Sequence, residues 1–403
     1  MDGKQYLTAR EAAEMLGIRR ATLYSYVSRG LVRSEPAERG KRTHRYHAQD
    51  VRRLLERKQQ QRDPAAAAQQ ALHFGAPVLE SSITLIDEGC LYYRGYDAVQ
   101  LAQTRRMEEV ASLIWRSSLD AGFRGDEQAP GGTPLRLPGN AGLTTVARFQ
   151  MALPRLEAAD DAAYDLRAEA LARTGEHILR QLTAIAADAP VGERSLVQTL
   201  QHGWGREEAA HGRLLQAALI LCADHELNVS SFTARCVASA GATPYQVVLA
   251  GLAALQGTRH GGHTARVAAL LREVREPSRA RPSLAARLRR GESIPGFGHP
   301  LYPQGDPRGR LLLHMVREAF PQSAAVALAD AVSQAAQAII GVLPTVDFGL
   351  AVLAEALDLD DDAPLTLFAL GRTVGWIGQA IEQYESGQII RPRARYVGPL
   401  PDA

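Results

Sequence analysis

Residues 257–262 read Gly-Thr-Arg-His-Gly-Gly, and residues 295–300 read Pro-Gly-Phe-Gly-His-Pro. In each stretch a histidine, His260 or His299, stands beside glycines, whose lack of a side chain lets the backbone approach a ligand closely. Asp347 lies further along in an apolar run, where an unpaired carboxylate would be costly. A lone histidine is more often structural than catalytic, but two in glycine-rich loops together with this carboxylate predict a catalytic site.

The sequence around these loops is rich in alanine and leucine at helical spacing. Long helical patterns run over residues 160–187 and 207–221, and loops with glycine and proline, such as residues 125–140, separate segments of this kind. No repeat with a fixed period of about 20 to 50 residues is present. We therefore expect a mostly α-helical body.

Length and composition exclude several classes of protein. The 403 residues suffice for about two to four domains, and 46% hydrophobic with 22% charged residues excludes a disordered or fibrous chain. Cys90, Cys222 and Cys236 are too few for a disulfide scaffold and suit a reducing compartment. Neither a signal segment nor a stretch apolar enough to span a bilayer is evident. We expect a cytoplasmic protein.

The charge is distributed unevenly along the chain. The net charge is +2, but residues 1–62 carry 15 Lys and Arg against 7 Asp and Glu, which is +8 and leaves −6 for residues 63–403. A basic segment on a mildly acidic body is typical of a module that binds a polyanion, because neutralised phosphates release counterions. Double-stranded DNA is the expected partner of this segment.

The basic segment begins with the pattern of a helix-turn-helix. Thr8 and Glu11 form a capping box, so we expect a first helix to begin at Ala9. Gly17 breaks this helix, and a second amphipathic segment follows over about residues 19–28. The two segments predict a helix, a tight turn and a second helix.

A wing and a domain boundary follow. Residues 31–46 contain proline, glycine and a basic cluster that suit a hairpin wing. Asp50 is placed to cap a third helix. We therefore expect a winged helix-turn-helix domain at residues 1–62, followed by a linker at residues 63–77.

Residues 6–55 resemble the winged helix-turn-helix domains of the MerR and excisionase type. The resemblance rests on Tyr-Leu-Thr (6–8), Glu-Ala-Ala (11–13), Thr-Leu-Tyr (22–24), Arg-Gly-Leu (29–31), Arg-Tyr (45–46) and Asp-Val (50–51). Arg19, Arg20 and Thr22, at the start of the second helix, are then the expected contacts to base edges and phosphates, and Arg42 in the wing is expected to contact the DNA backbone. Alternatively, the basic face is merely solvated, or the module packs against the body and does not bind DNA.

The remainder of the chain, residues 78–396, resembles citrate synthases. The motifs are collinear and include Ser-Ile-Thr-Leu-Ile-Asp (82–87), Tyr-Arg-Gly-Tyr (93–96), Ala-Asp-His-Glu (223–226) and the two histidine loops. The resemblance implies large and small helical domains, which places a citrate synthase-like domain at residues 78–403 with the small subdomain at about residues 261–350. It also implies a homodimer, because in that family the carboxyl-terminal tail completes the partner's site.

The resemblance implies an acyltransferase reaction. In that family an aspartate removes a proton from the methyl group of acetyl-CoA, one histidine stabilises the enolate, and another polarises the ketone of oxaloacetate; by motif these are Asp347, His260 and His299. A thioester α-proton is weakly acidic, so a carboxylate can remove it only if a donor meets the charge that develops on the oxygen. Acyl-CoA is a substrate, and no further cofactor is expected. His260 and His263 are three residues apart, as two metal ligands can be, but no third His, Cys or carboxylate stands at matching spacing. We therefore expect no metal site.

Oxaloacetate has two carboxylates, and the planar guanidinium group of arginine can bind a carboxylate through two parallel hydrogen bonds. The resemblance maps the arginines of the family onto Arg308 in Asp-Pro-Arg, Arg372 in Gly-Arg-Thr-Val-Gly-Trp, and Arg391 near the carboxyl terminus. His225 resembles a further substrate contact, although a histidine on a helical segment is also consistent with a satisfied core residue.

The chain departs from the citrate synthase pattern on the acyl-CoA side. The departures are His263 and Thr264, where alanine and asparagine are common, and Pro300 and Pro303, where basic residues are common. Because proline offers no cation to a CoA phosphate, either other residues such as Arg259 or Arg310 compensate or CoA binds weakly. The citrate synthase family also includes 2-methylcitrate synthases, which use propionyl-CoA. Because one methylene changes binding by only about 1 to 3 kcal/mol, acetyl-CoA and propionyl-CoA both stay open as substrates.

Two functions stay open. The first is an enzyme that condenses a short acyl-CoA with oxaloacetate. The second is a transcriptional regulator whose citrate synthase-like body senses a metabolite without converting it. The presence of Asp347 together with both histidines favours the enzyme, because a sensor needs only the arginines that bind carboxylates.

Overall fold

The computed structural model describes residues 6–36, 44–52, 54–55, 79–119, 142–394 and 396–398. The chain divides into two compact units, Met1–Glu80 and Ser81–Ala403. The expected linker at residues 63–77 and Arg42 of the expected wing lie outside the described residues.

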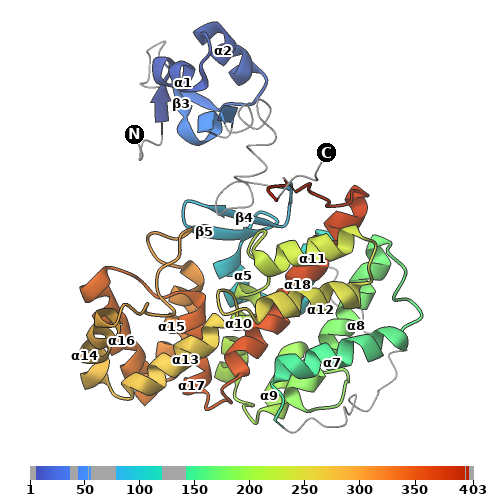
Figure 1. The fold of residues 1–403 in the computed structure, drawn as a ribbon, viewed down its shortest axis with the longest axis vertical. Helices are drawn as coiled ribbons and strands as arrows, with labels where there is room; N and C mark the ends of the chain where they lie inside the picture. Colours follow the sequence, from blue (N-terminus) through green and yellow to red (C-terminus); the bar gives the residue numbers. More distant parts are fainter. Residues whose placement is uncertain are drawn as a thin grey trace. The chain divides into compact units, whose positions relative to one another are not determined.

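The amino-terminal unit is a helix-turn-helix module with a small sheet (Figure 1). Its elements are β1 (Tyr6–Thr8), α1 (Ala9–Leu16), α2 (Arg20–Ser28), β2 (Ser34–Pro36), β3 (His44–His47) and a third helical segment that begins at residue 48. The sheet is antiparallel with the order β1-β3-β2. Both helices and the sheet contribute to one apolar core, which consists of Ala12, Leu16, Leu23, Val32, Tyr46 and Val51.

Side-chain caps explain where the first helix of this module begins. Thr8 Oγ1 accepts the backbone N–H of Glu11 at 3.2 Å, and the Glu11 carboxylate accepts that of Thr8 at 2.8 Å, so the predicted capping box is confirmed. Gly17 ends α1 with φ at 59°. The prediction that Asp50 caps the third helix is wrong. Asp50 lies inside that helical segment, and its carboxylate accepts the backbone N–H and the guanidinium of Arg33 at 2.8 and 2.9 Å.

The body is mostly α-helical, as the sequence predicts. A small antiparallel sheet, β4 (Thr84–Asp87), β5 (Cys90–Tyr93) and β6 (Tyr96–Asp97), precedes the helices. The helices are α5 (Ala98–Thr104), α6 (Met107–Arg116), α7 (Thr145–Ala158), α8 (Ala168–Ala187), α9 (Leu196–Gly203), α10 (Ala209–Leu221), α11 (Val229–Ser239), α12 (Pro244–Leu255), α13 (His263–Val274), η1 (Pro277–Arg279), α14 (Ala280–Arg289), α15 (Pro307–Ala319), α16 (Ala324–Ile340), α17 (Val346–Ala356) and α18 (Ala363–Ser386). Within the described part of the chain, no helix combines the length and apolar character needed to cross a membrane.

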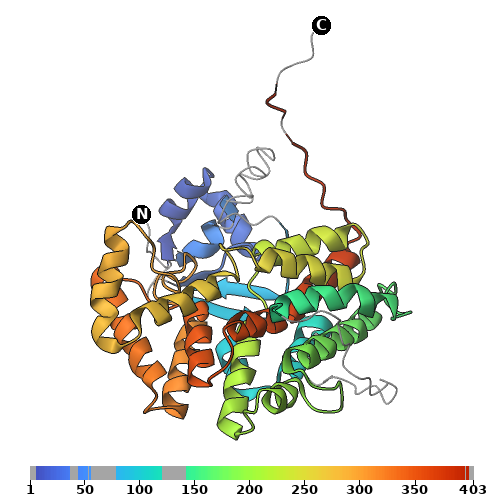
Figure 2. The same ribbon diagram turned by 60° about the horizontal axis from the view of Figure 1, so that its bottom comes forward.

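Helix α18 is the centre of the body. In Figures 1 and 2, the helices α13 to α17 gather on one side of it, and α7 to α9 lie on the other. A Cβ atom at Gly371 would lie 2.5 Å from the carbonyl oxygen of Leu219 in α10, so glycine allows the two helix backbones to meet. Arg372 and Trp376, which follow on α18, are 1% and 0% exposed. The helix thus fixes two large polar side chains inside the body.

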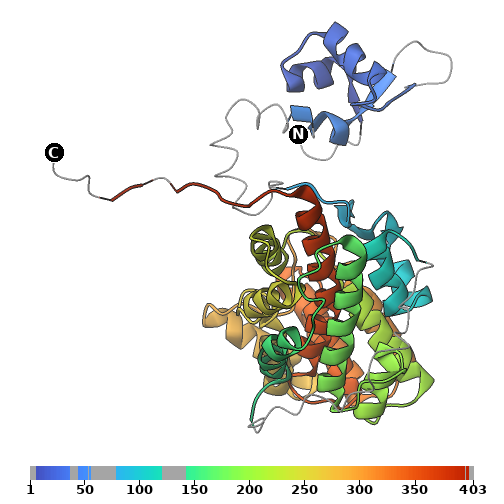
Figure 3. The ribbon, with the colours of Figure 1, turned by 90° about the vertical axis from the view of Figure 1, so that its right-hand side faces the viewer.

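Beyond α18 the chain is extended. Figure 3 shows the segment after Ser386 leaving the packed helices. Near its start, the backbone N–H of Ile390 donates to Ser239 Oγ at 3.1 Å. Arg391 follows and is exposed.

Gly309 is a point where α15 packs directly against the backbone that precedes α17. A Cβ at Gly309 would lie 2.4 Å from the carbonyl oxygen of Thr345. We expect Gly309→Ala to lower the free energy of unfolding by about 1 to 3 kcal/mol, because the backbone at Thr345 must move. Urea denaturation measures this change. Gly192→Ala is the matched control, since a Cβ there meets nothing within 4 Å; equal stability of the two variants would contradict the packing argument.

Candidate active site

His225 and His299 come from distant segments and lie side by side. His225 follows α10, His299 precedes α15, and their ring centroids are 5.3 Å apart. The hydroxyl oxygen of Tyr302 lies 2.9 Å from Nε2 of His225. Burial and then the positive charges of Arg308 and Arg372 hold the pKa of His225 well below its usual range. His225 is therefore a neutral imidazole.

His260 is anchored by a serine on α11. Its Nε2 lies 2.8 Å from Ser230 Oγ, and Trp376 Nε1 donates to the same oxygen at 3.1 Å. Burial and, to a lesser extent, Arg372 lower the pKa of His260 to about 4. The ring is therefore neutral near pH 7, and its orientation is set through Ser230 by a side chain of α18.

His299 has a defined tautomer. Its Nδ1 accepts the backbone N–H of Leu301 at 3.2 Å, so the proton of the neutral ring is on Nε2. Burial and the positive charge of Arg308 lower the pKa of His299 to about 4, against the opposing effect of Asp306. The Nε2–H group is then available as a donor at neutral pH.

Arg308 forms an ion pair with Asp306, two residues earlier in the chain. Its Nε and one terminal nitrogen donate to the two carboxylate oxygens of Asp306 at 3.0 and 2.9 Å. Burial alone would raise the pKa of Asp306, but Arg308 outweighs it and the pKa is lowered. Asp306 also accepts the backbone N–H of Val346 at 2.9 Å. Asp306 thus joins the start of α15 to the start of α17, next to Asp347.

Arg372 presents an unsatisfied donor. Its Nε donates to the carbonyl oxygen of Cys222 at 2.8 Å, while one terminal nitrogen is buried and has no hydrogen-bond partner among the described residues. Burial lowers the pKa of Arg372, against the opposing effect of Asp224. A buried guanidinium nitrogen without a partner is costly unless a ligand supplies an acceptor.

Asp347 lies in the first turn of α17. Thr345 Oγ1 donates to its Oδ2 at 3.2 Å. Burial raises the pKa of Asp347 and outweighs His263 and Arg308, which both lower it. A carboxylate whose pKa is raised in this way is a stronger base than one in water.

These side chains form one group, which we call the catalytic cluster. It consists of His225, His260, His299, Arg308, Asp347 and Arg372, each of which lies close enough to another member to shift its pKa. Arg391 is the one predicted substrate-binding residue that the single chain does not bring to the cluster. The sequence analysis missed Ser230, Tyr302 and Trp376. For Asp306 a signal was available, because it stands two residues before Arg308 in the Asp-Pro-Arg motif.

The predicted DNA contacts lie on the amino-terminal unit. Arg19 is the N-cap residue of α2, Arg20 begins the helix, and Thr22 lies in its first turn. Both arginines are exposed, and their side chains make no ion pair with the described residues, whereas Thr22 is half-buried. Of the expected wing contacts, Arg42 lies outside the described residues.

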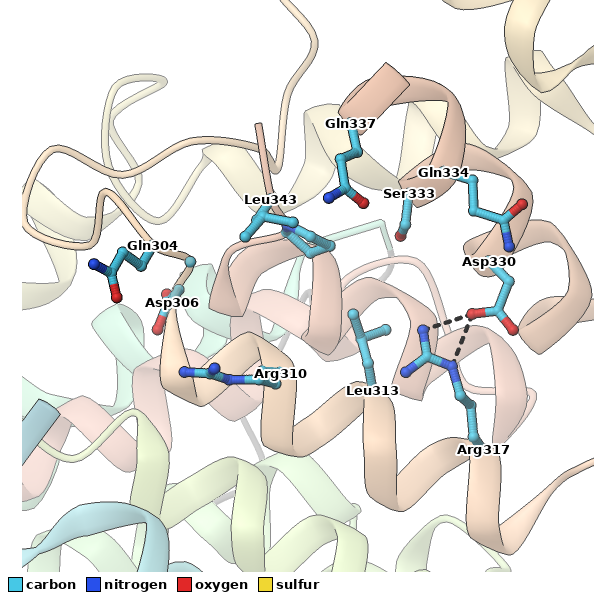
Figure 4. A pocket seen from close by; sticks show the side chains of 12 residues that line it. Gln304, Asp306, Arg310, Leu313, Arg317, Asp330, Ser333, Gln334, Gln337 and Leu343 are labelled. Atoms are coloured by element: carbon cyan, nitrogen blue, oxygen red, sulfur yellow. Dashed lines mark hydrogen bonds and ion pairs between the residues drawn. The ribbon is translucent and has the colours of Figure 1, made fainter. Parts of the chain in front are cut away.

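A cavity of about 290 Å³ adjoins Asp306 (Figure 4). It lies between α15, α16 and the segment before Thr345. Arg317 and Asp330 form an ion pair at one end, and Arg310, which is exposed and unpaired among the described residues, lies toward Asp306. Among the described residues, no group of three or more metal-ligating side chains is present.

Comparison with known proteins agrees with this architecture. The family model described as citrate synthase, C-terminal domain, matches residues 72–393, and a helix-turn-helix domain model matches residues 6–59. The fold and the matched families define an α-helical acyltransferase joined to a helix-turn-helix module. The chain belongs to the citrate synthase family.

Relatives and solved structures cover most of the chain. Citrate synthase 2 of Bacillus subtilis is 29% identical over 81% of this chain and 95% of the relative, and the citrate synthase of Haloferax volcanii is 31% identical over 80% and 94%. A 2-methylcitrate synthase of Corynebacterium glutamicum is 28% identical over 76% and 88%. The crystal structure of citrate synthase from Thermotoga maritima superimposes with a TM-score of 0.68 at 28% identity, covering 82% of this chain and 96% of that one.

Proposed function

We propose that the body condenses a short acyl-CoA, acetyl-CoA or propionyl-CoA, with oxaloacetate, and that water then cleaves the thioester to release CoA. The observation that carries this proposal is the catalytic cluster, in which a carboxylate with a raised pKa, neutral imidazoles and an unsatisfied guanidinium lie together. Relatives named citrate synthase and 2-methylcitrate synthase support both acyl groups.

Asp347 acts as the base and His260 as the donor to the thioester oxygen. Ser230 Oγ lies 2.9 Å from Asn228 Oδ1 and 2.8 Å from His260 Nε2, and its single proton serves one of them at a time. Because Asn228 Oδ1 already accepts two backbone N–H groups, we assign the hydroxyl proton to His260 Nε2. Trp376 donates to the same hydroxyl oxygen, which favours this orientation. The proton of the neutral His260 ring is then on Nδ1 and faces the enolate oxygen as Asp347 removes the α-proton.

His299 acts on the other substrate. Its Nε2–H donates to the ketone oxygen of oxaloacetate and transfers the proton as the carbon–carbon bond forms and the oxygen becomes an alkoxide. His225, held by Tyr302, is the further contact to this substrate. Neutral rings suit both tasks, because each histidine needs one positioned N–H group rather than a full positive charge.

Arginines bind the carboxylates of oxaloacetate. Arg372 has a free buried terminal nitrogen for this purpose. Two guanidinium nitrogens of Arg308 already donate to Asp306, so Arg308 contributes to substrate binding mainly its charge and its third nitrogen. Arg391 lies on the extended tail, and we propose that it completes the site of the second subunit in a homodimer.

The acyl-CoA phosphates need cations that Pro300 and Pro303 cannot supply. We assign this task to Arg259 and Arg310. Both are exposed and make no ion pair within the described residues, and Arg310 lines the cavity beside Asp306. The solved citrate synthase of Thermoplasma acidophilum, which shares this fold at 23% identity, is described as a ternary complex with carboxymethyl coenzyme A and oxaloacetate.

A thiol-release assay tests the proposed activity. Purified full-length protein is mixed with oxaloacetate and either acetyl-CoA or propionyl-CoA, and the freed thiol is followed with a chromogenic disulfide. We expect oxaloacetate-dependent CoA release with at least one acyl-CoA. No release with either would favour the alternative function, a transcriptional regulator whose body binds a metabolite without converting it.

The helix-turn-helix module favours DNA as a further partner. Arg19 and Arg20 are exposed at the start of α2, the second helix, which enters the major groove in helix-turn-helix domains. We expect the full-length protein to bind a mixed-sequence DNA duplex with an affinity that falls steeply with salt. Arg19→Ala combined with Arg20→Ala should weaken binding and reduce the salt slope by about 2, as for the loss of two phosphate contacts.

Fluorescence anisotropy at several salt concentrations measures this effect. Arg279→Ala combined with Arg281→Ala is the control, because it removes the same charge from exposed positions of the body. If both double variants bind as the wild type does, α2 is not the DNA-binding element.

A further inference from the structure

A third histidine links the two histidine loops. His263 begins α13, three residues after His260, and its Nε2 accepts the backbone N–H of Gly296 at 3.0 Å. Gly296 belongs to the loop that carries His299. The bond therefore ties the position of one proposed catalytic histidine to that of the other.

The same peptide segment is tied to the loop that precedes Asp347. The carbonyl oxygen of Gly296 accepts the backbone N–H of Thr345 at 2.9 Å, and Gly298 N–H donates to the carbonyl oxygen of Leu343 at 2.9 Å. Gly296 is enclosed, because a Cβ there would lie 2.9 Å from Val267 of α13 and 3.1 Å from Phe348 of α17. Gly296 thus connects three loops, and only its bond to His263 depends on a side chain.

His263 also interacts electrostatically with the proposed base. Among the charged groups around Asp347, His263 lowers its pKa most, ahead of Arg308, while Asp306 raises it. In turn, burial lowers the pKa of His263, Asp347 raises it, and Arg266 of the same helix lowers it. Because Nε2 accepts an N–H group, the ring is neutral with its proton on Nδ1, and a proton added at Nε2 would break the bond to Gly296.

We propose that His263 is a positioning residue for the acyl transfer, which acts by holding Gly296 between the His260, His299 and Asp347 loops. This inference rests on the proposed function. It concerns a feature of this chain, since His263 stands where the citrate synthase motif commonly has alanine. For the same reason, we expect His263→Ala to fold.

Two substitutions separate the role of the hydrogen bond from that of the imidazole ring. His263→Ala removes both, and we expect kcat for CoA release to fall by about 10- to 100-fold, as for a small misplacement of reacting groups, with the KM for oxaloacetate changed by less than about twofold. His263→Gln keeps an acceptor for Gly296 N–H, and we expect it to recover most of kcat above neutral pH.

Hydrogen exchange gives a readout that does not depend on activity. In His263→Ala, the Gly296 amide should exchange about 2- to 10-fold faster than in the wild type, whereas His263→Gln should retain its protection. His314→Ala is the control for both measurements, since His314 is exposed on α15 and pairs with Glu318.

The outcomes are distinguishable. If the wild type releases CoA and His263→Ala matches it in kcat, the inference is wrong while the proposed function stands. If His263→Ala is slow and His263→Gln does not restore kcat, His263 is merely structural and the inference is also wrong. If the wild type releases no CoA, the proposed function is wrong, and the positioning role falls with it even where the exchange result agrees.

Discussion

Asp347→Asn lowers kcat for CoA release by about 10²- to 10⁴-fold, the contribution typical of a positioned general base. Asparagine has nearly the same shape and still accepts the hydrogen bond from Thr345 Oγ1, but it cannot take the α-proton of the thioester. Binding of oxaloacetate, measured by calorimetry, should change little, because the carboxylates of that substrate are assigned to arginines. The thiol-release assay measures the loss of kcat.

Asp361→Asn is the matched control for this substitution. Asp361 is an exposed carboxylate that pairs with Arg272 on the surface, so its loss should leave kcat unchanged. Activity of Asp347→Asn within a factor of about three of the wild type would exclude Asp347 as the base, since removal of a general base costs far more.

Arg372→Gln raises the KM for oxaloacetate by about 30-fold or more, because truncating one partner of a buried charge pair costs about 2 to 5 kcal/mol. The substitution removes the unsatisfied guanidinium nitrogen that we assign to a substrate carboxylate. Burial lowers the pKa of Arg372 even without substrate, which shows that this cation is desolvated in the folded protein. Burial raises the pKa of Asp224 and Arg372 is the charge that most lowers it, so stability must be measured beside KM.

Three measurements make this prediction specific. Arg372→Lys keeps the charge but not the fork, and we expect it to recover only part of the affinity. Arg272→Gln, on the surface, is the control. Thermal unfolding reports whether Arg372→Gln folds, and a folded Arg372→Gln with unchanged KM would show that Arg372 does not bind the substrate.

Local signals predicted the fold best where side chains cap the backbone nearby. The Thr8 and Glu11 pair correctly predicts the start of α1, because both partners lie within one turn. The helical pattern over residues 160–187 begins too early, since α8 starts at Ala168. Asp160 Oδ1 accepts the backbone N–H of Ala162 at 2.9 Å, and turns of this kind compete with helix formation.

The cluster itself could be predicted only as a set of residue types. The motifs identified His260, His299 and Asp347, and the structure brings them near one another. The sequence could not reveal that Ser230 links Trp376 of α18 to His260, because 146 residues separate Ser230 from Trp376. Nor could it show that the fork of Arg308 is already occupied by Asp306.

Arg372 and Trp376 are four residues apart on α18, so their side chains lie one turn from each other on the same buried helix. In the proposed function, Arg372 binds the oxo acid directly, and Trp376 acts on the thioester through Ser230 and His260. Laboratory evolution toward a new acyl group should therefore leave residues 363–386 unchanged and select substitutions in the loops between helices. The reason is that a shift of α18 would displace both reactants at once.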